Sequence, residues 1–102
     1  MPTRLEILKS MVENNPADSF SRYGLAMELR NIGDLDGAMR EFEELRRQNP
    51  DYSATYFHAG QTLERMGRID EARALYQEGI EVTGRKGDLH AKSELQAALD
   101  LL

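Results

Sequence analysis

The sequence predicts an all-α fold, in which about six helices form a stack of antiparallel hairpins. Three observations lead to this prediction. Apolar residues recur at helical spacing, apolar and turn positions repeat with a period of 34 residues, and single glycines punctuate the helical stretches. The length of 102 residues corresponds to one domain, and we take residues 1–102 as that domain.

The repeat is visible when the chain is offset by 34 residues. The matching positions are apolar or turn residues, whereas most mismatches are polar. Identical or closely similar pairs are Leu29 and Leu63, Gly33 and Gly67, Asp36 and Asp70, Ala38 and Ala72, Tyr23 and Phe57, Phe42 and Tyr76, and Pro16 and Pro50. A period of this length is typical of repeated helix–turn–helix units, which bury their apolar faces only by stacking on neighbours.

These positions resemble the pattern of the tetratricopeptide repeat family. The resemblance places one repeat at residues 19–52 and a second at residues 53–86, and implies a right-handed superhelical α-solenoid. The pattern asks for a small residue in the first helix, a glycine turn, an alanine and then an aromatic in the second helix, and a closing proline. The residues at these positions are Ala26 and Gly60, Gly33 and Gly67, Ala38 and Ala72, Phe42 and Tyr76, and Pro50, with Gly84 in place of a second proline.

Two positions depart from the pattern. The expected large aromatic near the start of each repeat is Arg22 in the first repeat and Tyr56 in the second. The expected small residue late in each repeat is Leu45 in the first and Gly79 in the second.

Flanking helices are expected at both ends. Thr3 and Glu6 have the spacing of a capping box, which predicts an N-terminal capping helix at residues 3–14. Asp88 is a suitable N-cap for a C-terminal capping helix at residues 88–101. The full set of expected helices is 3–14, 18–31, 35–48, 52–65, 69–83 and 88–101.

Composition narrows the function classes. The chain has no cysteine, which excludes disulfides, a thiol nucleophile and thiolate metal sites, and suits a reducing compartment such as the cytoplasm. The net charge of −5 argues against nucleic acid as a partner, because phosphate-binding proteins concentrate Lys and Arg on one face. No apolar stretch is long enough to span a membrane, and no signal peptide is evident.

The residues offer little support for catalysis or for a cofactor. The two histidines are far apart, and only His90 has a carboxylate, Glu94, four residues away. Two ligands fall short of the four that a structural metal site usually needs. No serine has a His–acid arrangement around it, and no glycine-rich phosphate loop is present. We therefore expect no enzyme, no metal and no cofactor.

The family resemblance implies that the first helix of each hairpin lines a concave groove that holds a protein or peptide partner. Carried over by position, the groove residues are Phe20, Tyr23, Met27, Arg30 and Asn31 in the first repeat, and Ala54, Phe57, Gln61, Glu64 and Arg65 in the second. Some members of the family clamp a peptide carboxylate with lysine and asparagine at two of these positions. Here those positions hold Tyr23 and Met27, then Phe57 and Gln61, so the clamp is absent.

The sequence thus favours a non-enzymatic scaffold or adaptor that binds a peptide or an amphipathic helix. Three alternatives stay open. Tyr23 and Phe57 could be core residues that pack together or under a terminal helix, because apolar residues at helical spacing usually are. The protein could instead be structural and form a homodimer through the apolar faces of its end helices, an idea suggested by Leu99, Leu101 and Leu102. An enzyme or metal protein would rest on His90.

Overall fold

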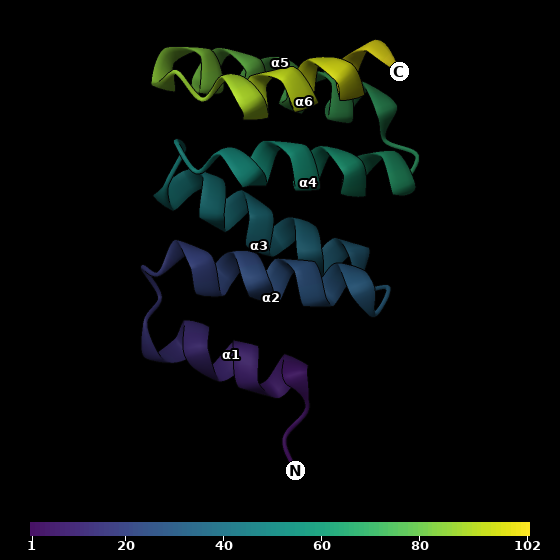
Figure 1. Cartoon of the computed structure of the whole chain (residues 1–102). Coiled ribbons are helices and arrows are strands. Elements are labelled where there is room, and N and C mark those ends of the chain that lie inside the picture. The colour runs from purple at the N-terminus through teal and green to yellow at the C-terminus, as the bar shows by residue number, and fades with distance from the viewer. The chain divides into compact units, whose positions relative to one another are not determined.

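The computed structural model describes all residues from 1 to 102 and consists of six α-helices (Figure 1). The helices are α1 (Arg4–Asn14), α2 (Ser19–Asn31), α3 (Leu35–Gln48), α4 (Ser53–Arg65), α5 (Ile69–Lys86) and α6 (Leu89–Asp100). They belong to two compact units, Met1–Asn49 with α1 to α3, and Pro50–Leu102 with α4 to α6. The predicted all-α fold of antiparallel helix pairs is confirmed. No helix combines the length and apolar composition of a bilayer span.

The first unit is a hairpin of α2 and α3, with α1 packed on α2. Its buried apolar residues are Val12, Leu25, Ala26, Leu29, Ala38, Met39, Phe42 and Leu45. Ala26 and Ala38 have no exposed surface, because the two helices cross closely there. Gly24 marks the close approach of α1, since a Cβ at that position would lie 3.2 Å from Leu8 Cδ2.

The second unit is a hairpin of α4 and α5, with α6 packed mainly on α5 and also reaching α4. Its buried apolar residues are Tyr56, Ala59, Leu63, Ala72, Leu75, Tyr76, Val82, Leu95 and Ala98. Leu95 of α6 is buried against Gly79 of α5. The two residues approach so closely that a Cβ added at Gly79 would lie 2.9 Å from Leu95 Cδ1.

Three of the turns between helices are built alike around a glycine with positive φ. In each, the glycine N–H and the next N–H donate back to carbonyls in the last turn of the helix, which satisfies groups that would otherwise be unpaired. The glycines and their φ angles are Gly33 (90°), Gly67 (77°) and Gly87 (77°). The second donors, Asp34, Arg68 and Asp88, reach Leu29, Leu63 and Thr83 at 2.9 Å in every case.

The predicted helix at residues 69–83 is present, but its predicted end at residue 83 is three residues too early, and Gly84 does not close the second repeat. Helix α5 continues through Gly84 and ends at Lys86, and Gly87 provides the turn. Helix α6 therefore follows a turn of the within-hairpin kind. Lys86 holds the extra turn in place, because its Nζ donates to the carbonyl of Asp51 and to Ser53 Oγ at 3.1 Å.

The two predicted caps are confirmed. Thr3 Oγ1 accepts from the Glu6 N–H at 3.1 Å, and the Thr3 N–H donates to Glu6 Oε1 at 3.1 Å. This pairing lowers the pKa of Glu6, mainly because the carboxylate accepts a backbone hydrogen bond. Asp88 Oδ1 accepts from the Ala91 N–H at 3.3 Å, and the same bond lowers the pKa of Asp88.

Candidate functional site

The predicted groove residues of the first unit form a stripe along one side of α2. Their spacing of three or four residues places them on a common helix face. Phe20 is the most exposed member, with 70% of its surface accessible. Asn31 is also exposed, whereas Tyr23, Met27 and Arg30 are half-buried. Burial raises the pKa of the Tyr23 hydroxyl, and the charge of Arg30 opposes that shift. The stripe therefore presents an aromatic ring at its start and a cation at its end.

The corresponding residues of the second unit lie on α4. Ala54, Phe57, Gln61 and Glu64 are half-buried, and Arg65 is exposed. The Phe57 ring meets the ring of its neighbour His58 edge to face, with centroids 5.3 Å apart. Where α2 begins with an exposed phenylalanine, α4 has Ala54, so the α4 face is the less apolar of the two.

Gln61 and Glu64 are also part of a hydrogen-bonded network with Tyr76 of α5. The Tyr76 hydroxyl donates to Glu64 Oε2 and accepts from Gln61 Nε2 at 2.9 Å. Gln61 Nε2 lies 3.4 Å from the same carboxylate oxygen. Burial raises the pKa of Tyr76, and the neighbouring Glu64 carboxylate raises it further. Two of the predicted groove residues thus brace the hairpin of their own unit.

This network was not predicted from the sequence, although the repeat contains a signal for it. The counterparts of Tyr76, Gln61 and Glu64 in the first repeat are Phe42, Met27 and Arg30. In the second repeat the aromatic ring has a hydroxyl, and Gln61 and Glu64 both bond it. In the first repeat the ring has no hydroxyl, and Met27 and Arg30 stand at the two positions. The three positions differ together because a buried hydroxyl needs partners.

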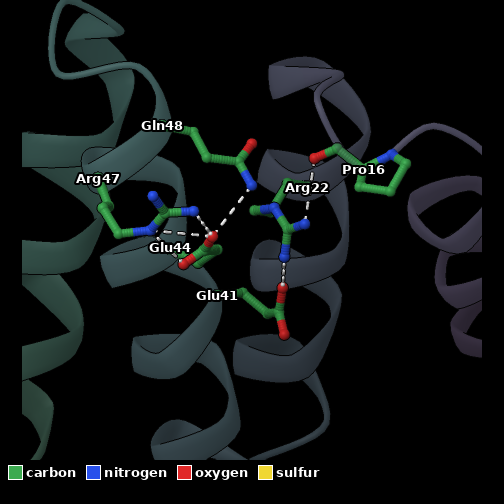
Figure 2. A network of polar contacts seen from close by, with 6 residues as sticks. All are labelled: Pro16, Arg22, Glu41, Glu44, Arg47 and Gln48. Atoms are coloured by element: carbon green, nitrogen blue, oxygen red, sulfur yellow. Dashed lines mark hydrogen bonds and ion pairs between the residues drawn. The ribbon is translucent and has the colours of Figure 1, made fainter.

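Arg22 makes in the first unit the kind of bond that Tyr56 makes in the second, and Figure 2 shows Arg22 beside Pro16. Arg22 Nη2 donates to the carbonyl of Pro16 at 3.2 Å, and the Tyr56 hydroxyl donates to the carbonyl of Pro50 at 2.5 Å. Each donor lies six residues after its proline. The departure from the family pattern at residue 22 therefore keeps the bond that closes the loop before the hairpin.

Arg22 is accompanied by a carboxylate that the second repeat lacks. Its Nη1 donates to Glu41 Oε1 at 2.6 Å, and the second-repeat counterpart of Glu41 is the buried Leu75. The Arg22 side chain is 11% exposed and the Glu41 side chain 25%. The first repeat thus replaces an aromatic–aliphatic pair with an ion pair that is largely shielded from water.

Next to this pair, α3 carries a surface carboxylate with a lowered pKa (Figure 2). Arg47 Nε donates to Glu44 Oε2 at 2.9 Å, and Gln48 Nε2 donates to Glu44 Oε1 at 3.0 Å. The bonds from Arg47, and then that from Gln48, hold the pKa of Glu44 at about 2.

The lowered pKa of Glu44 predicts an acid-sensitive contribution to stability. A carboxylate whose pKa is lower in the folded state stabilises the protein above its unfolded pKa of about 4.3 and loses that effect as pH falls through the folded value. We expect Glu44→Gln to lower the urea midpoint at pH 6 and to match wild type near pH 2, in urea titrations followed by circular dichroism. Arg47→Met should behave in the same way. A difference from wild type that stays constant with pH would contradict this prediction.

A cleft of ≈ 290 Å³ lies on one side of the first unit, beside α2 and between α1 and α3. Its residues are Lys9, Val12, Glu13, Arg22, Leu25, Leu29, Asp34, Gly37, Arg40 and Glu41. The lining includes three aliphatic side chains, three cations and three carboxylates. Such a balance selects neither an anionic nor a cationic ligand.

No group of three or more histidine and acidic side chains in the chain is arranged to hold a metal ion. His90 Nε2 lies 3.4 Å from Glu94 Oε1, and both side chains are largely exposed on α6. The His–carboxylate spacing that the sequence suggested at residues 90 and 94 thus corresponds to a contact between two side chains, fewer than a structural metal site needs.

Three features together define a class of helical repeat protein. The helices of each hairpin cross at small residues, the turns contain glycine, and an arginine or tyrosine side chain donates to the carbonyl of the preceding proline. The tetratricopeptide repeat family model matches residues 32–99, and the chain belongs to that family. Tetratricopeptide repeats are protein-interaction modules and are generally non-catalytic.

Individual relatives agree with this assignment. A TPR repeat-containing protein of Pseudomonas aeruginosa is 25% identical over 95 residues, which cover 93% of this chain and 90% of that protein. A tetratricopeptide repeat domain protein of Salinibacter ruber, solved by NMR, is 42% identical with a TM-score of 0.80, over 83% of this chain and 86% of its own. The type III secretion translocator chaperone SycD of Yersinia enterocolitica has the same fold, with a TM-score of 0.89 at 17% identity, over 96% of this chain and 74% of its own.

Proposed function

We propose that this chain is a non-enzymatic scaffold or adaptor that binds a peptide or an amphipathic helix of another protein on the α2 stripe. The stripe consists of Phe20, Tyr23, Met27, Arg30 and Asn31. The observation that carries the proposal is Phe20, an aromatic side chain that leaves 70% of its surface accessible at the start of an otherwise half-buried apolar row. Exposed aromatic, methionine and arginine side chains are enriched in the centres of protein interfaces.

The chemistry of the stripe indicates the kind of partner. Phe20 and Met27 offer apolar surface, and Arg30 and Asn31 offer hydrogen-bond donors one or two turns away. A segment with apolar anchors spaced three or four residues apart, followed by an acidic or amide group, complements such a row. The two positions that would clamp a terminal carboxylate hold Tyr23 and Met27 in place of lysine and asparagine, so we propose recognition of an internal segment.

The α4 face is less suited than the α2 stripe to bind apolar anchors. Phe57 supplies part of an aromatic surface, and Arg65 is exposed at the helix end. Gln61 and Glu64 already bond Tyr76, and a ligand that displaced them would leave the buried hydroxyl without partners. We therefore propose that the apolar anchors of the partner bind α2 and not the middle of α4.

The test is binding of a peptide selected on the protein itself. Peptides of about 16 residues are selected from a displayed library on wild-type protein, and affinity is then measured for wild type, Phe20→Ala and the matched control Ile32→Ala. Ile32 is also an exposed apolar residue of the first unit, at 56%, but lies outside the stripe. Loss of a central aromatic anchor should cost about 2 kcal/mol, or roughly thirtyfold in affinity, and the control should change little.

The outcome of this test decides the proposal. Both variants should fold as wild type does, because substitution of exposed side chains usually changes stability by less than about 0.5 kcal/mol. Amide shifts on binding should cluster in α2. Peptides that bind Phe20→Ala as tightly as wild type, or that shift amides outside α2 and α4, would overturn it.

Self-association is the second candidate function. Four of the exposed large apolar residues lie near the ends of the chain, Ile7 and Met11 on α1, Leu89 on α6 and Leu101 after it, with exposed fractions of 49%, 43%, 69% and 88%. Apolar surface of this kind supports contact with a second copy or another protein.

A further inference from the structure

Helix α1 has the features of the second helix of a hairpin. It ends at Asn15, whose φ and ψ of −143° and 77° nearly equal the −141° and 78° of Asn49 at the end of α3. The two asparagine N–H groups donate to the carbonyls of Met11 and Leu45, at 3.0 Å and 2.8 Å, and a proline follows each. The 34-residue offset therefore pairs α1 with α3.

The counterparts in α1 of the buried α3 residues are less buried than those residues. The buried residues of α3 are Gly37, Ala38, Met39, Phe42 and Leu45, and the α1 residues 34 positions earlier are Thr3, Arg4, Leu5, Leu8 and Met11. None of these five residues is buried: Leu5 and Leu8 are half-buried, whereas Thr3, Arg4 and Met11 are exposed. Met11 is 43% exposed, and its neighbour on the same helix, Ile7, is 49% exposed. Within the first unit α1 packs on α2 and on no other helix. Helix α1, whose single buried residue is Val12, thus buries less of its surface than α3 does.

The exposed face of α1 is uncharged at its centre. Thr3, Ile7, Ser10 and Asn14 recur at spacings of three and four residues, which places them on one face of the helix. Met11 lies at its edge. Ser10, in the middle, is small enough to let another helix approach closely. A face with two aliphatic side chains around a small residue is complementary to a copy of itself in the antiparallel direction.

The charges at the helix ends also favour an antiparallel copy. Helix α1 has no basic residue in its last turn, so its C-terminal carbonyls have no cation nearby within the helix. Arg4, at the other end, is 75% exposed, with its Nε 3.5 Å from Glu28 Oε1. In an antiparallel pair each Arg4 lies beside the other helix's C-terminus, where the helix dipole attracts a positive charge.

We infer that two copies of this chain associate through α1, antiparallel and about a two-fold axis near Lys9 and Ser10, with Ile7 of one copy against Met11 of the other. A two-fold contact is the commonest form of self-association. An 11-residue helix is about 16 Å long, so the shared surface is small and the dimer is weak and concentration-dependent. The inference does not depend on partner binding by α2, because the residues involved lie outside that stripe.

Sedimentation velocity tests the dimer on the full 102-residue chain. Wild type should move from the 11.6 kDa monomer to twice that mass as its concentration rises to the order of 1 mM. Ile7→Glu combined with Met11→Glu should stay monomeric, with an unchanged circular dichroism spectrum. The matched control Ile32→Glu, at a 56% exposed site that follows α2, should behave as wild type. A wild type that stays monomeric throughout, or a dimer that persists in the Ile7 and Met11 variant, overturns the inference.

A second measurement uses the absence of cysteine from the chain. Ser10→Cys places one thiol near the proposed axis, where two Cα atoms can approach within the 4.4–6.8 Å that a disulfide needs. Under mild oxidation this variant should form a covalent dimer. The control Ser93→Cys, exposed on α6, should not. Equal cross-linking of the two variants overturns the inference, and this readout does not depend on how the glutamate variant folds.

Discussion

Arg22→Ala is expected to lower the free energy of unfolding by about 3 kcal/mol, because removal of one partner of a shielded ion pair leaves the other without compensation. Arg22 is 9% exposed. Its guanidinium donates to Glu41 Oε1 at 2.6 Å and to the Pro16 carbonyl at 3.2 Å. Truncation leaves Glu41, whose side chain is 25% exposed, without its ion-pair partner. The loop before α2 also loses the bond that closes it.

The measurement is urea unfolding of wild type and variants, and the second repeat supplies the control. Arg22→Tyr, Glu41→Leu and Leu45→Gly together transplant the set of Tyr56, Leu75 and Gly79 into the first repeat. We expect this triple variant to recover most of the stability, because a tyrosine at residue 22 can reach the Pro16 carbonyl as Tyr56 reaches that of Pro50. A loss of less than about 0.5 kcal/mol for Arg22→Ala, the range of ordinary surface changes, would show that the pair is not structural.

Gly60→Ala is expected to destabilise the second unit by about 3 kcal/mol, at the upper end of the cost of overpacking a core. A Cβ at residue 60 would lie 2.1 Å from Cε1 of Tyr76 and 2.6 Å from Cζ. The ring cannot move aside easily, because it is fully buried and its hydroxyl is bonded by Gln61 and Glu64. The first repeat accepts Ala26 at this position.

Gly84→Ala is the matched control for this prediction. Gly84 lies inside α5 of the same unit, and a Cβ there would meet nothing closer than Lys92 Nζ at 3.7 Å. A glycine-to-alanine change inside a helix without a clash stabilises by roughly 0.5–1 kcal/mol. Thermal unfolding should therefore move in opposite directions for the two variants. A Gly60→Ala protein that melts at or above the wild-type temperature would show that Tyr76 can shift without loss.

Most of the fold was predictable because local residues determine it. The helix starts at Thr3 and Asp88 follow from side chains that bond the first turn, and the turns at Gly33 and Gly67 follow from a conformation that glycine adopts without strain. The 34-residue spacing then identifies which helices pair. These signals lie within a few residues of the feature that they specify.

The end of α5 was not predictable in this way. Gly84 and Gly87 are both plausible helix stops, and the repeat register favours the first. The structure uses the second because burial of Val82 and Thr83, the bonds of Lys86 to the loop before α4, and the packing of α6 together outweigh the cost of about 1 kcal/mol for a glycine inside a helix. The Lys86 bonds join residues more than 30 positions apart.

The candidate site was also predictable in part. Periodicity was enough to place Phe20, Tyr23 and Met27 on one face of a helix, and to show that the second repeat has a different set of residues there. How far Phe20 protrudes, and that Gln61 and Glu64 bond a buried hydroxyl, depend on the packing of α3 on α2 and of α5 on α4. The sequence by itself determined the helices, the turns and the pairing of helices, since each follows from short-range chemistry. Tertiary structure alone decided which side chains are free to meet a partner, because burial is a property of the packed unit.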